Sequence, residues 1–175
     1  MNRVLAASLA LGLVVSLSSC GSSSSSGSAQ ARSEAPADAP GRTNTVPPAP
    51  AAGQSRAGQI YSVYIASPTG DTVAFTVFEP TQITGGVKYP LVLEGHGFSG
   101  SRQTSASADI KSLLDNGYGV ISIDQRGHGE TSGTIRVMDP DVEGRNLIAI
   151  LDWAEARLGW LAYGRSTNGK DSHNL

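Results

Sequence analysis

Residues 89–133 read YPLVLEGHGFSGSRQTSASADIKSLLDNGYGVISIDQRGHGETSG, and this stretch decides the fold. It holds two short apolar segments, residues 90–93 and 120–123, and a polar, glycine-rich motif follows each of them. A continuous apolar run of this kind is typical of a parallel strand that is covered on both faces. Between them, residues 105–116 place aliphatic side chains at helical spacing, and Gly117 can adopt the left-handed conformation that ends a helix. The stretch therefore predicts a strand-helix-strand unit whose two motifs meet at one edge of a sheet.

Two further strands and one helix flank this unit. Residues 59–66 alternate polar and apolar side chains, a turn sequence follows, and residues 72–78 are again strand-like, which predicts an antiparallel hairpin. Asp139 and Pro140 predict the start of a longer helix, because the Asp can cap it and the Pro fits its first turn. One face of that helix would carry Leu147, Leu151, Ala154 and Leu158. The order β-β-β-α-β-α predicts an α/β sandwich with helices on both faces of the sheet.

Residues 1–20 are predicted to be a lipoprotein-type signal peptide. Arg3 precedes an uncharged apolar run, residues 4–17, which is too short to span a bilayer. The sequence LSSC that ends at Cys20 resembles a bacterial lipobox, in which the cysteine receives the lipid. A lipid on Cys20 would anchor the protein in the bacterial cell envelope, facing the periplasm or on the outer surface. The alternative is an ordinary secretory signal with Cys20 as an incidental thiol, and both interpretations predict export.

Residues 21–57 are predicted to be a disordered linker, and residues 58–175 a partial domain. The linker is rich in Ser, Ala, Gly and Pro and has no aromatic residue, so it offers little to bury in a core. The formal net charge of -2 comes from scattered charges, which give no basic surface for nucleic acid. The histidines lack the spacing of a metal site, and a single cysteine cannot form a disulfide within the chain. We therefore expect neither a metal nor another cofactor.

The two glycine-rich motifs resemble those of the α/β-hydrolase superfamily. Residues 95–98, GHGF, follow the first strand of the unit, and residues 124–133, DQRGHGETSG, follow the second. More narrowly, the chain is similar to the Xaa-Pro dipeptidyl-peptidase and cocaine-esterase-like serine hydrolases, whose second motif has the form D-x-R-G-x-G-x-S-x-G. Here Thr131 stands where that motif has its serine, and Ser132 comes one position later. The resemblance covers about residues 60–158 and implies the N-terminal part of an α/β-hydrolase sandwich.

The first motif is where this resemblance implies part of a catalytic site. The backbone N–H of Phe98 is the candidate oxyanion-hole donor, which would stabilise the negative oxygen formed during acyl transfer. Gly97 would shape the loop and let the backbone approach the substrate, although the glycines could instead serve only a tight turn. His96 is expected to shape the same loop rather than to act as the catalytic base.

The second motif is expected to be structural. Asp124 would accept hydrogen bonds from backbone N–H groups of the turn at residues 126–127. Arg126 would hold the same loop in place. His128, between two glycines, is expected to be a solvated loop residue.

A nucleophile is the missing part of this pattern. Residues 164–169, GRSTNG, nearly match the G-x-S-x-G nucleophile elbow, but they trail from a helix and turn-forming residues follow, so Ser166 is expected in a surface loop. The nucleophile strand, and the acid and base that follow it in this superfamily, would then lie beyond residue 175. The chain is thus expected to be an N-terminal fragment of an exported serine hydrolase, truncated before the nucleophile strand and inactive alone. The complete protein would act on a small-molecule ester or peptide.

Two other interpretations remain open. The chain could be a non-catalytic envelope lipoprotein that uses a partial α/β fold for binding. A separate C-terminal chain could also complement it and supply the missing strands. In the superfamily's strand order, the strand at residues 91–93 would pair with the missing one, so we expect that strand to lie at the edge of the sheet.

Overall fold

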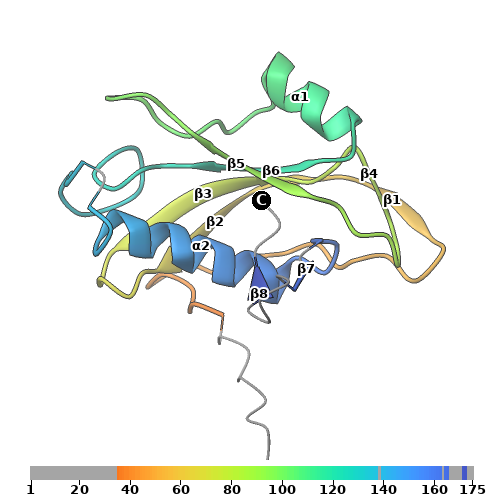
Figure 1. Ribbon diagram of the computed structural model, residues 1–175, viewed down its shortest axis with the longest axis horizontal. Helices are drawn as coiled ribbons and strands as arrows, with labels where there is room; N and C mark the ends of the chain where they lie inside the picture. The colour runs from red at the N-terminus through yellow and green to blue at the C-terminus, as the bar shows by residue number, and fades with distance from the viewer. Residues whose placement is uncertain (1–34, 138, 163, 166–170, 173–175) are drawn as a thin grey trace, which may run out of the picture. The chain divides into compact units, whose positions relative to one another are not determined.

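The computed structural model describes residues 35–137, 139–162, 164–165 and 171–172. In chain order its elements are β1 (Ser55–Ala57), β2 (Ile60–Ala66), β3 (Thr72–Phe78), β4 (Gln82–Thr84), β5 (Leu91–Gly95), α1 (Ala108–Asp115), β6 (Gly119–Ile123), α2 (Glu143–Arg157), β7 (Gly164–Arg165) and β8 (Asp171–Ser172). The central sheet has the order β2-β3-β6-β5, in which β5 and β6 are parallel and the other neighbours are antiparallel (Figure 1). Within the residues described, no helix is long and apolar enough to cross a membrane.

The predicted hairpin forms from β2 and β3. Val63 stands opposite Phe75 in the antiparallel register, and both side chains are buried. The Ser67 N–H donates to the Asp71 carbonyl oxygen over 2.8 Å and closes the turn between the strands. The period-two alternation at residues 59–66 therefore predicts the buried face of β2 correctly, whereas β3 is buried on both faces.

The predicted strand-helix-strand unit also forms, from β5, α1 and β6. Leu93 stands opposite Ile121 in the parallel register. The connecting helix begins at Ala108, a few residues later than predicted, because the Ser107 hydroxyl accepts the Ile110 N–H and caps the helix there. Gly117, with a φ of +82°, follows the helix as expected for a left-handed glycine.

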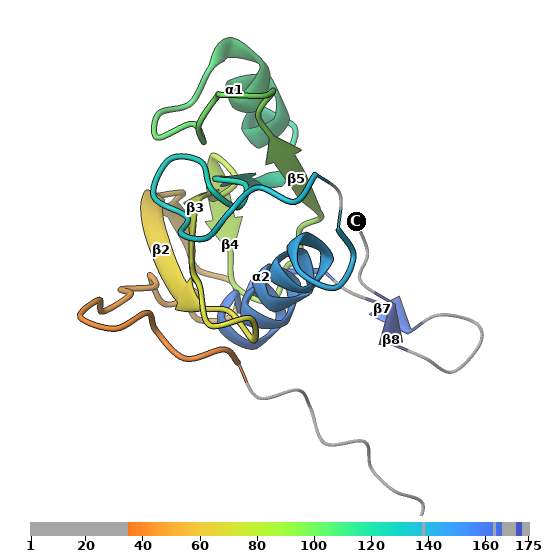
Figure 2. The same cartoon turned by 90° about the vertical axis from the view of Figure 1, so that its left-hand side faces the viewer.

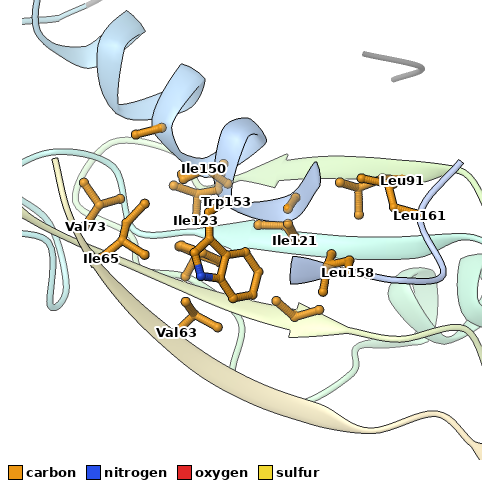
Figure 3. Close-up of a cluster of buried hydrophobic side chains, with 14 of the residues drawn as sticks. Val63, Ile65, Val73, Leu91, Ile121, Ile123, Ile150, Trp153, Leu158 and Leu161 are labelled. Atoms are coloured by element: carbon orange, nitrogen blue, oxygen red, sulfur yellow. The ribbon is translucent and has the colours of Figure 1, made fainter. Parts of the chain in front are cut away.

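The two helices lie on opposite faces of the central sheet, as Figure 2 shows. On one face, Trp153 of α2 packs edge-on against Phe75 of β3, with ring centroids 5.1 Å apart, inside the larger apolar cluster of Figure 3. On the other face, Phe78 and Val120 pack against Ile110 of α1. Burial of side chains of this size contributes about 1.5–3 kcal/mol each, so these two clusters stabilise the layered arrangement.

The start of α2 differs from the prediction. The helix begins at Glu143 rather than at residues 139–140, and no side chain caps its first turn. The reason is the Glu143 carboxylate, which accepts backbone N–H bonds over 2.9–3.2 Å from Arg136, Val137 and Asp139. These bonds hold the preceding residues in a loop.

The buried face of α2 was also predicted only in part. Leu158 and Ala154 are buried as expected, but Leu147 is 43% exposed. The buried residues of the helix are Asn146, Ala149, Ile150, Trp153 and Ala154. Burying the large indole of Trp153 removes more apolar area from water than burying a leucine, and this rotates the helix relative to the predicted stripe.

The prediction of a disordered linker at residues 21–57 is wrong for residues 35–57. The Ala39 N–H donates to the Tyr64 carbonyl oxygen over 3.0 Å, and the side chain of Asn44 binds both the N–H and the carbonyl oxygen of Tyr64. Farther along, β1 pairs with β4. Hydrogen bonds to the free edge of β2 hold this segment together with the apolar contacts of Ala39 and Val46, and the composition of the segment does not predict these hydrogen bonds.

A buried carboxylate ties the same segment to the core. Glu79, at the end of β3, has a fully buried side chain that accepts two hydrogen bonds from the Arg56 guanidinium, at 2.5 and 2.9 Å. It also accepts the Gln59 N–H at 3.0 Å and the Trp160 indole N–H at 3.1 Å. The hydrogen bond to Glu79 raises the pKa of Arg56, despite the opposing effect of burial. Four donors thus satisfy one carboxylate that joins residues distant in the sequence.

β5 lies at the edge of the central sheet, as predicted. Just before it, Tyr89 forms a parallel bridge with Leu161, so the segment after α2 pairs with the chain beside this edge. The predicted surface loop at residues 164–169 begins instead with β7, which pairs with β8. Ser166 and residues 174–175 lie outside the described residues, as do the signal peptide and Cys20.

Candidate active site

The loops after β5 and β6 meet at the C-terminal ends of these parallel strands. His96 joins them, because its Nε2 accepts the Gln125 backbone N–H over 3.2 Å. Its Nδ1 lies 2.7 Å from the carbonyl oxygen of Gly97. Since Nε2 faces a donor and Nδ1 faces an acceptor, the imidazole fits the tautomer with the proton on Nδ1. His96 therefore links the first loop to the second through its two ring nitrogens.

Phe98 is at the tip of this first loop, with 85% of the residue exposed. Its backbone N–H donates to no acceptor among the described residues. The Gly97 carbonyl oxygen accepts the Gly100 N–H over 3.0 Å and closes the turn, and the left-handed residue in that turn is Ser99, with a φ of +59°. A Cβ at Gly97 would meet nothing within 4 Å, so open space lies beside the unpaired N–H group.

The prediction that His128 is a solvated loop residue is wrong. Its ring lies half-buried beside His96, with centroids 4.9 Å apart, and Phe98 meets it edge-on at 5.9 Å. Gly127 and Gly129 both have positive φ values, of +73° and +52°, and they turn the loop back toward the first motif. The Nδ1 of His128 lies 3.1 Å from the Arg126 carbonyl oxygen, whereas its buried Nε2 has no partner among the described residues.

Asp124 is buried and structural, but its partners differ from those predicted. Its carboxylate accepts the backbone N–H groups of Arg102, at 2.7 Å, and Glu130, at 2.9 Å, and it forms an ion pair with the Arg102 guanidinium. The predicted donors at residues 126–127 do not contact it. Gly129 explains the change, because a Cβ there would overlap the carboxylate, and its absence lets the loop close around Asp124.

Arg102 connects the two loops. Its guanidinium binds Asp124 and Glu130, the latter at 2.5 Å, and its Nε donates to Thr76 Oγ1 over 3.1 Å. Burial lowers the pKa of Arg102, but the hydrogen bonds to Glu130 and Asp124 outweigh it and the net direction is upward. The same hydrogen bond from Arg102 lowers the pKa of Glu130. Arg102 and Glu130 are therefore both charged at neutral pH, and the ion pairs of Arg102 fix the loop that carries Phe98 against the loop after β6.

Arg126 contacts both the second loop and the hairpin. Its Nε donates to the Thr134 carbonyl oxygen over 2.9 Å, within the same loop. Its guanidinium forms an ion pair with Asp71, in the turn between β2 and β3. The loop is therefore attached both to itself and to the hairpin.

An apolar pocket of about 380 Å³ opens beside these loops. It lies between the loop after β6 and the N-terminal half of α2, and Phe98 and His128 are on its wall. Its aliphatic lining residues are Val73, Ile123, Ile135, Val137, Pro140, Leu147 and Ile150. Among the residues described, no group of three or more His, Cys, Asp or Glu side chains could hold a metal ion.

A profile of the X-Pro dipeptidyl-peptidase (S15) family matches residues 69–170. The chain belongs to this family. The match includes both loops of the site, from β3 through α2. Together with the strand order β2-β3-β6-β5, S15 family membership confirms the predicted fold, part of an α/β-hydrolase sandwich.

Relatives of this S15-family chain are longer than it is. An uncharacterized 31.7 kDa protein from Escherichia coli, encoded in the traX-finO intergenic region, is 31% identical over 71 residues. That alignment covers 41% of this chain and 25% of the relative. The chain therefore spans a quarter of the length of that relative.

Solved structures of hydrolases are also similar to it. An esterase of Pyrococcus furiosus matches with a TM-score of 0.48 and 21% identity, over 60% of this chain and 40% of the esterase. An α/β serine hydrolase without a lid from Xanthomonas campestris matches with a TM-score of 0.42 and 19% identity, over 57% of this chain and 45% of the hydrolase.

Sequence reasoning missed two residues of this S15-family site. Arg102 is the only arginine between the two motifs, and this was the one feature of the sequence that could have pointed to it. Asn146 interrupts the apolar face of α2 and lines the pocket with only 5% of the residue exposed. None of the described serines stands in a G-x-S-x-G sequence.

Proposed function

We propose that the complete protein is a serine hydrolase that cleaves an ester or amide bond of a small-molecule or peptide substrate. The observation that carries this proposal is the backbone N–H of the exposed residue Phe98, which is unpaired among the described residues and lies in the loop after a parallel strand, beside an apolar pocket. Acyl transfer places negative charge on a carbonyl oxygen, and a fixed backbone N–H stabilises that charge. S15 family membership supports the same reaction class.

The support behind the loop favours this role over a simple turn. An oxyanion donor is effective when it is held in place before the reaction, so that no reorganisation is needed. Arg102, four residues after Phe98, is locked to the buried Asp124 by its backbone N–H and its guanidinium. His96 holds the other side of the loop through Gln125.

Export and anchoring are part of the proposal and are supported by the sequence pattern alone. A lipid on Cys20 would hold the protein at the cell envelope, so its substrates would be encountered outside the cytoplasm. Mass spectrometry of the protein from its native host would detect the diacylglyceryl modification at Cys20. A mature N-terminus without that modification would point to an ordinary secretory signal instead.

The hydrolase proposal is tested by labelling the protein made by its native host with a fluorophosphonate probe, which reacts with activated serines. Labelling combined with intact mass measurement identifies the species that carries the nucleophile. A purified protein that takes up no probe and cleaves no p-nitrophenyl ester would refute the proposal. The non-catalytic binding lipoprotein would then be the better interpretation.

The oxyanion assignment has a matched pair of variants. Phe98→Pro removes the N–H group, and the flexible Gly97 before it tolerates a following proline. Phe98→Ala removes the ring but keeps the N–H. We expect the proline variant to lose about 100-fold to 1,000-fold in kcat, and the alanine variant to lose far less. Equal losses in both variants would assign the effect to the ring instead.

A further inference from the structure

We propose that Glu94 and Ser122 are positioning residues of the candidate active site, which hold the loop after β5 so that the Phe98 N–H occupies one fixed position. The inference rests on the proposed function, because the two residues would act on the reaction only through that N–H. Neither residue belongs to the two glycine-rich motifs, at residues 95–98 and 124–133. The evidence is a row of polar side chains across the sheet.

This row consists of Thr76, Ser122 and Glu94, on three neighbouring strands. Ser122 of β6 stands opposite Thr76 of β3 on one side and opposite Glu94 of β5 on the other. Thr76 and Ser122 are only 1% and 0% exposed. Because side chains alternate between the faces of a strand, Ser122 shares its face with Val120, which packs against α1 (Figure 2). The apolar layer under α1 thus continues into buried hydroxyl groups, which are costly unless hydrogen bonds satisfy them.

The loop after β5 supplies these hydrogen bonds. Ser122 Oγ accepts the Gln103 backbone N–H over 2.8 Å, and the same hydroxyl donates to the Glu94 carboxylate. Beside it, Thr76 Oγ1 accepts the Nε–H of Arg102 over 3.1 Å. A serine hydroxyl has one proton to donate, so the bond to Glu94 turns a lone pair of Ser122 toward the Gln103 N–H. Glu94 therefore sets the orientation in which Ser122 holds the loop.

These two bonds connect the two ends of the loop that carries Phe98. Glu94 lies four positions before Phe98, and Gln103 lies five positions after it. The chain of hydrogen bonds from Glu94 through Ser122 to Gln103 therefore closes the loop across its base. A loop fixed at both ends has fewer conformations, and an oxyanion donor is effective when it is held in place before the reaction.

Steady-state kinetics of the complete protein on a p-nitrophenyl ester test the assignment. Ser122→Ala removes the acceptor of the Gln103 N–H, and Glu94→Leu removes the acceptor of the serine hydroxyl. We expect each substitution to lower kcat about tenfold and to change KM less than about twofold, because a misplaced donor is felt mainly in the transition state. An active enzyme whose kcat stays within about twofold of the wild type in both variants would overturn the inference.

Two further variants serve as matched controls. Glu94→Gln keeps a carbonyl oxygen that can accept the serine hydroxyl, so its kcat should stay within about threefold of the wild type. Ser55 also bonds to the side chain opposite it on a paired strand, Thr84, but at the surface and away from the loop. Ser55→Ala should leave kcat unchanged. A tenfold loss in Glu94→Gln would refute the role of the acceptor oxygen.

A double-variant cycle distinguishes positioning from a structural role. Once Phe98→Pro has removed the N–H group, the loop has no donor left to position. Adding Ser122→Ala should then lower kcat by less than about a further twofold. A residue that only stabilises the fold would lower kcat by the same factor in both backgrounds, and that result would overturn the inference.

Amide hydrogen exchange of the whole protein, followed by NMR, gives a readout that needs no activity. The Gly100 N–H donates to the Gly97 carbonyl oxygen within the loop, whereas Val120 lies in the central strand β6. We expect Ser122→Ala to accelerate exchange about tenfold at Gly100 and less than about twofold at Val120. Equal acceleration at both sites would indicate general destabilisation and overturn the inference. If the protein takes up no fluorophosphonate and cleaves no ester, the proposed function fails, while exchange still decides whether Ser122 holds the loop.

Discussion

Removing the charge of Glu79 is expected to destabilise the fold strongly. The side chain of Glu79 is completely buried, and its carboxylate accepts bonds from Arg56, Gln59 and Trp160. Breaking a buried ion pair by removing one partner costs about 3–5 kcal/mol. Because 20% of the Arg56 side chain is exposed, its charge can partly return to water, so for Glu79→Gln we expect the lower end, about 3 kcal/mol.

The assay is equilibrium urea unfolding followed by tryptophan fluorescence, which also reports on Trp160. In a thermal unfolding experiment, the same loss of about 3 kcal/mol in unfolding free energy should lower the midpoint temperature by about 10 °C for a chain of this length. Asp115→Asn is the control. The ion pair of Asp115 with Lys111, 3.4 Å long, lies at the surface, so this variant should leave the thermal midpoint almost unchanged. A double variant, Arg56→Met with Glu79→Met, should lose less than the sum of the two single losses.

The reasoning would be refuted by a Glu79→Gln protein that loses less than about 1 kcal/mol while unfolding with an unchanged urea dependence. That result would mean that residues 55–59 leave the core at little cost. Additivity in the double variant would separately show that the Arg56 and Glu79 side chains do not interact.

Two further predictions concern the charged network that joins the loops. Arg102→Met leaves the Asp124 carboxylate buried without its cation and should lower the unfolding free energy, measured in urea, by about 3–5 kcal/mol. Arg42 is an exposed ion-pair partner of Glu130, so Arg42→Met should lower it by less than about 0.5 kcal/mol. The pKa of Glu130 is lowered in the folded state, mainly by the hydrogen bond from Arg102. The ionised Glu130 side chain therefore contributes its full stabilisation above the ordinary glutamate pKa. This stabilisation is lost as the pH falls through the lowered pKa of the folded state. The urea midpoint of Glu130→Gln should therefore fall less steeply than that of the wild type below about pH 4.3, and identical slopes would contradict the assignment.

Much of the sheet could be predicted from the sequence because the relevant signals are local. Each strand shows in its own few residues how it is buried. Alternation at residues 59–66 indicates one buried face, and the continuous apolar run at residues 120–123 indicates burial on both faces. The glycine-rich motifs were placed correctly at the ends of parallel strands for the same reason. The helix of residues 108–115 was found from its spacing, and its exact start depended on the Ser107 cap.

The prediction for α2 was wrong where more than one apolar stripe fits the helical periodicity of the sequence. The predicted stripe of α2 and the observed one share Ala154, and the difference lies in whether Leu147 or Trp153 faces the sheet. Both stripes have helical periodicity, so spacing alone does not choose between them. The fit of the indole against Phe75 decides.

The sequence by itself determined the order of strands and helices, the parallel pair with its two loops and the family to which they belong. Only the tertiary structure decided which distant residues complete the site. Arg102 reaches Asp124 across 22 positions of the sequence, and Asn44 reaches Tyr64 across 20. Local periodicity is set by neighbouring residues, whereas a buried charge or an open strand edge takes its partner from whichever segment the fold brings near. Such partners carry no periodic signal, and for that reason the linker prediction and the role of His128 had to be corrected.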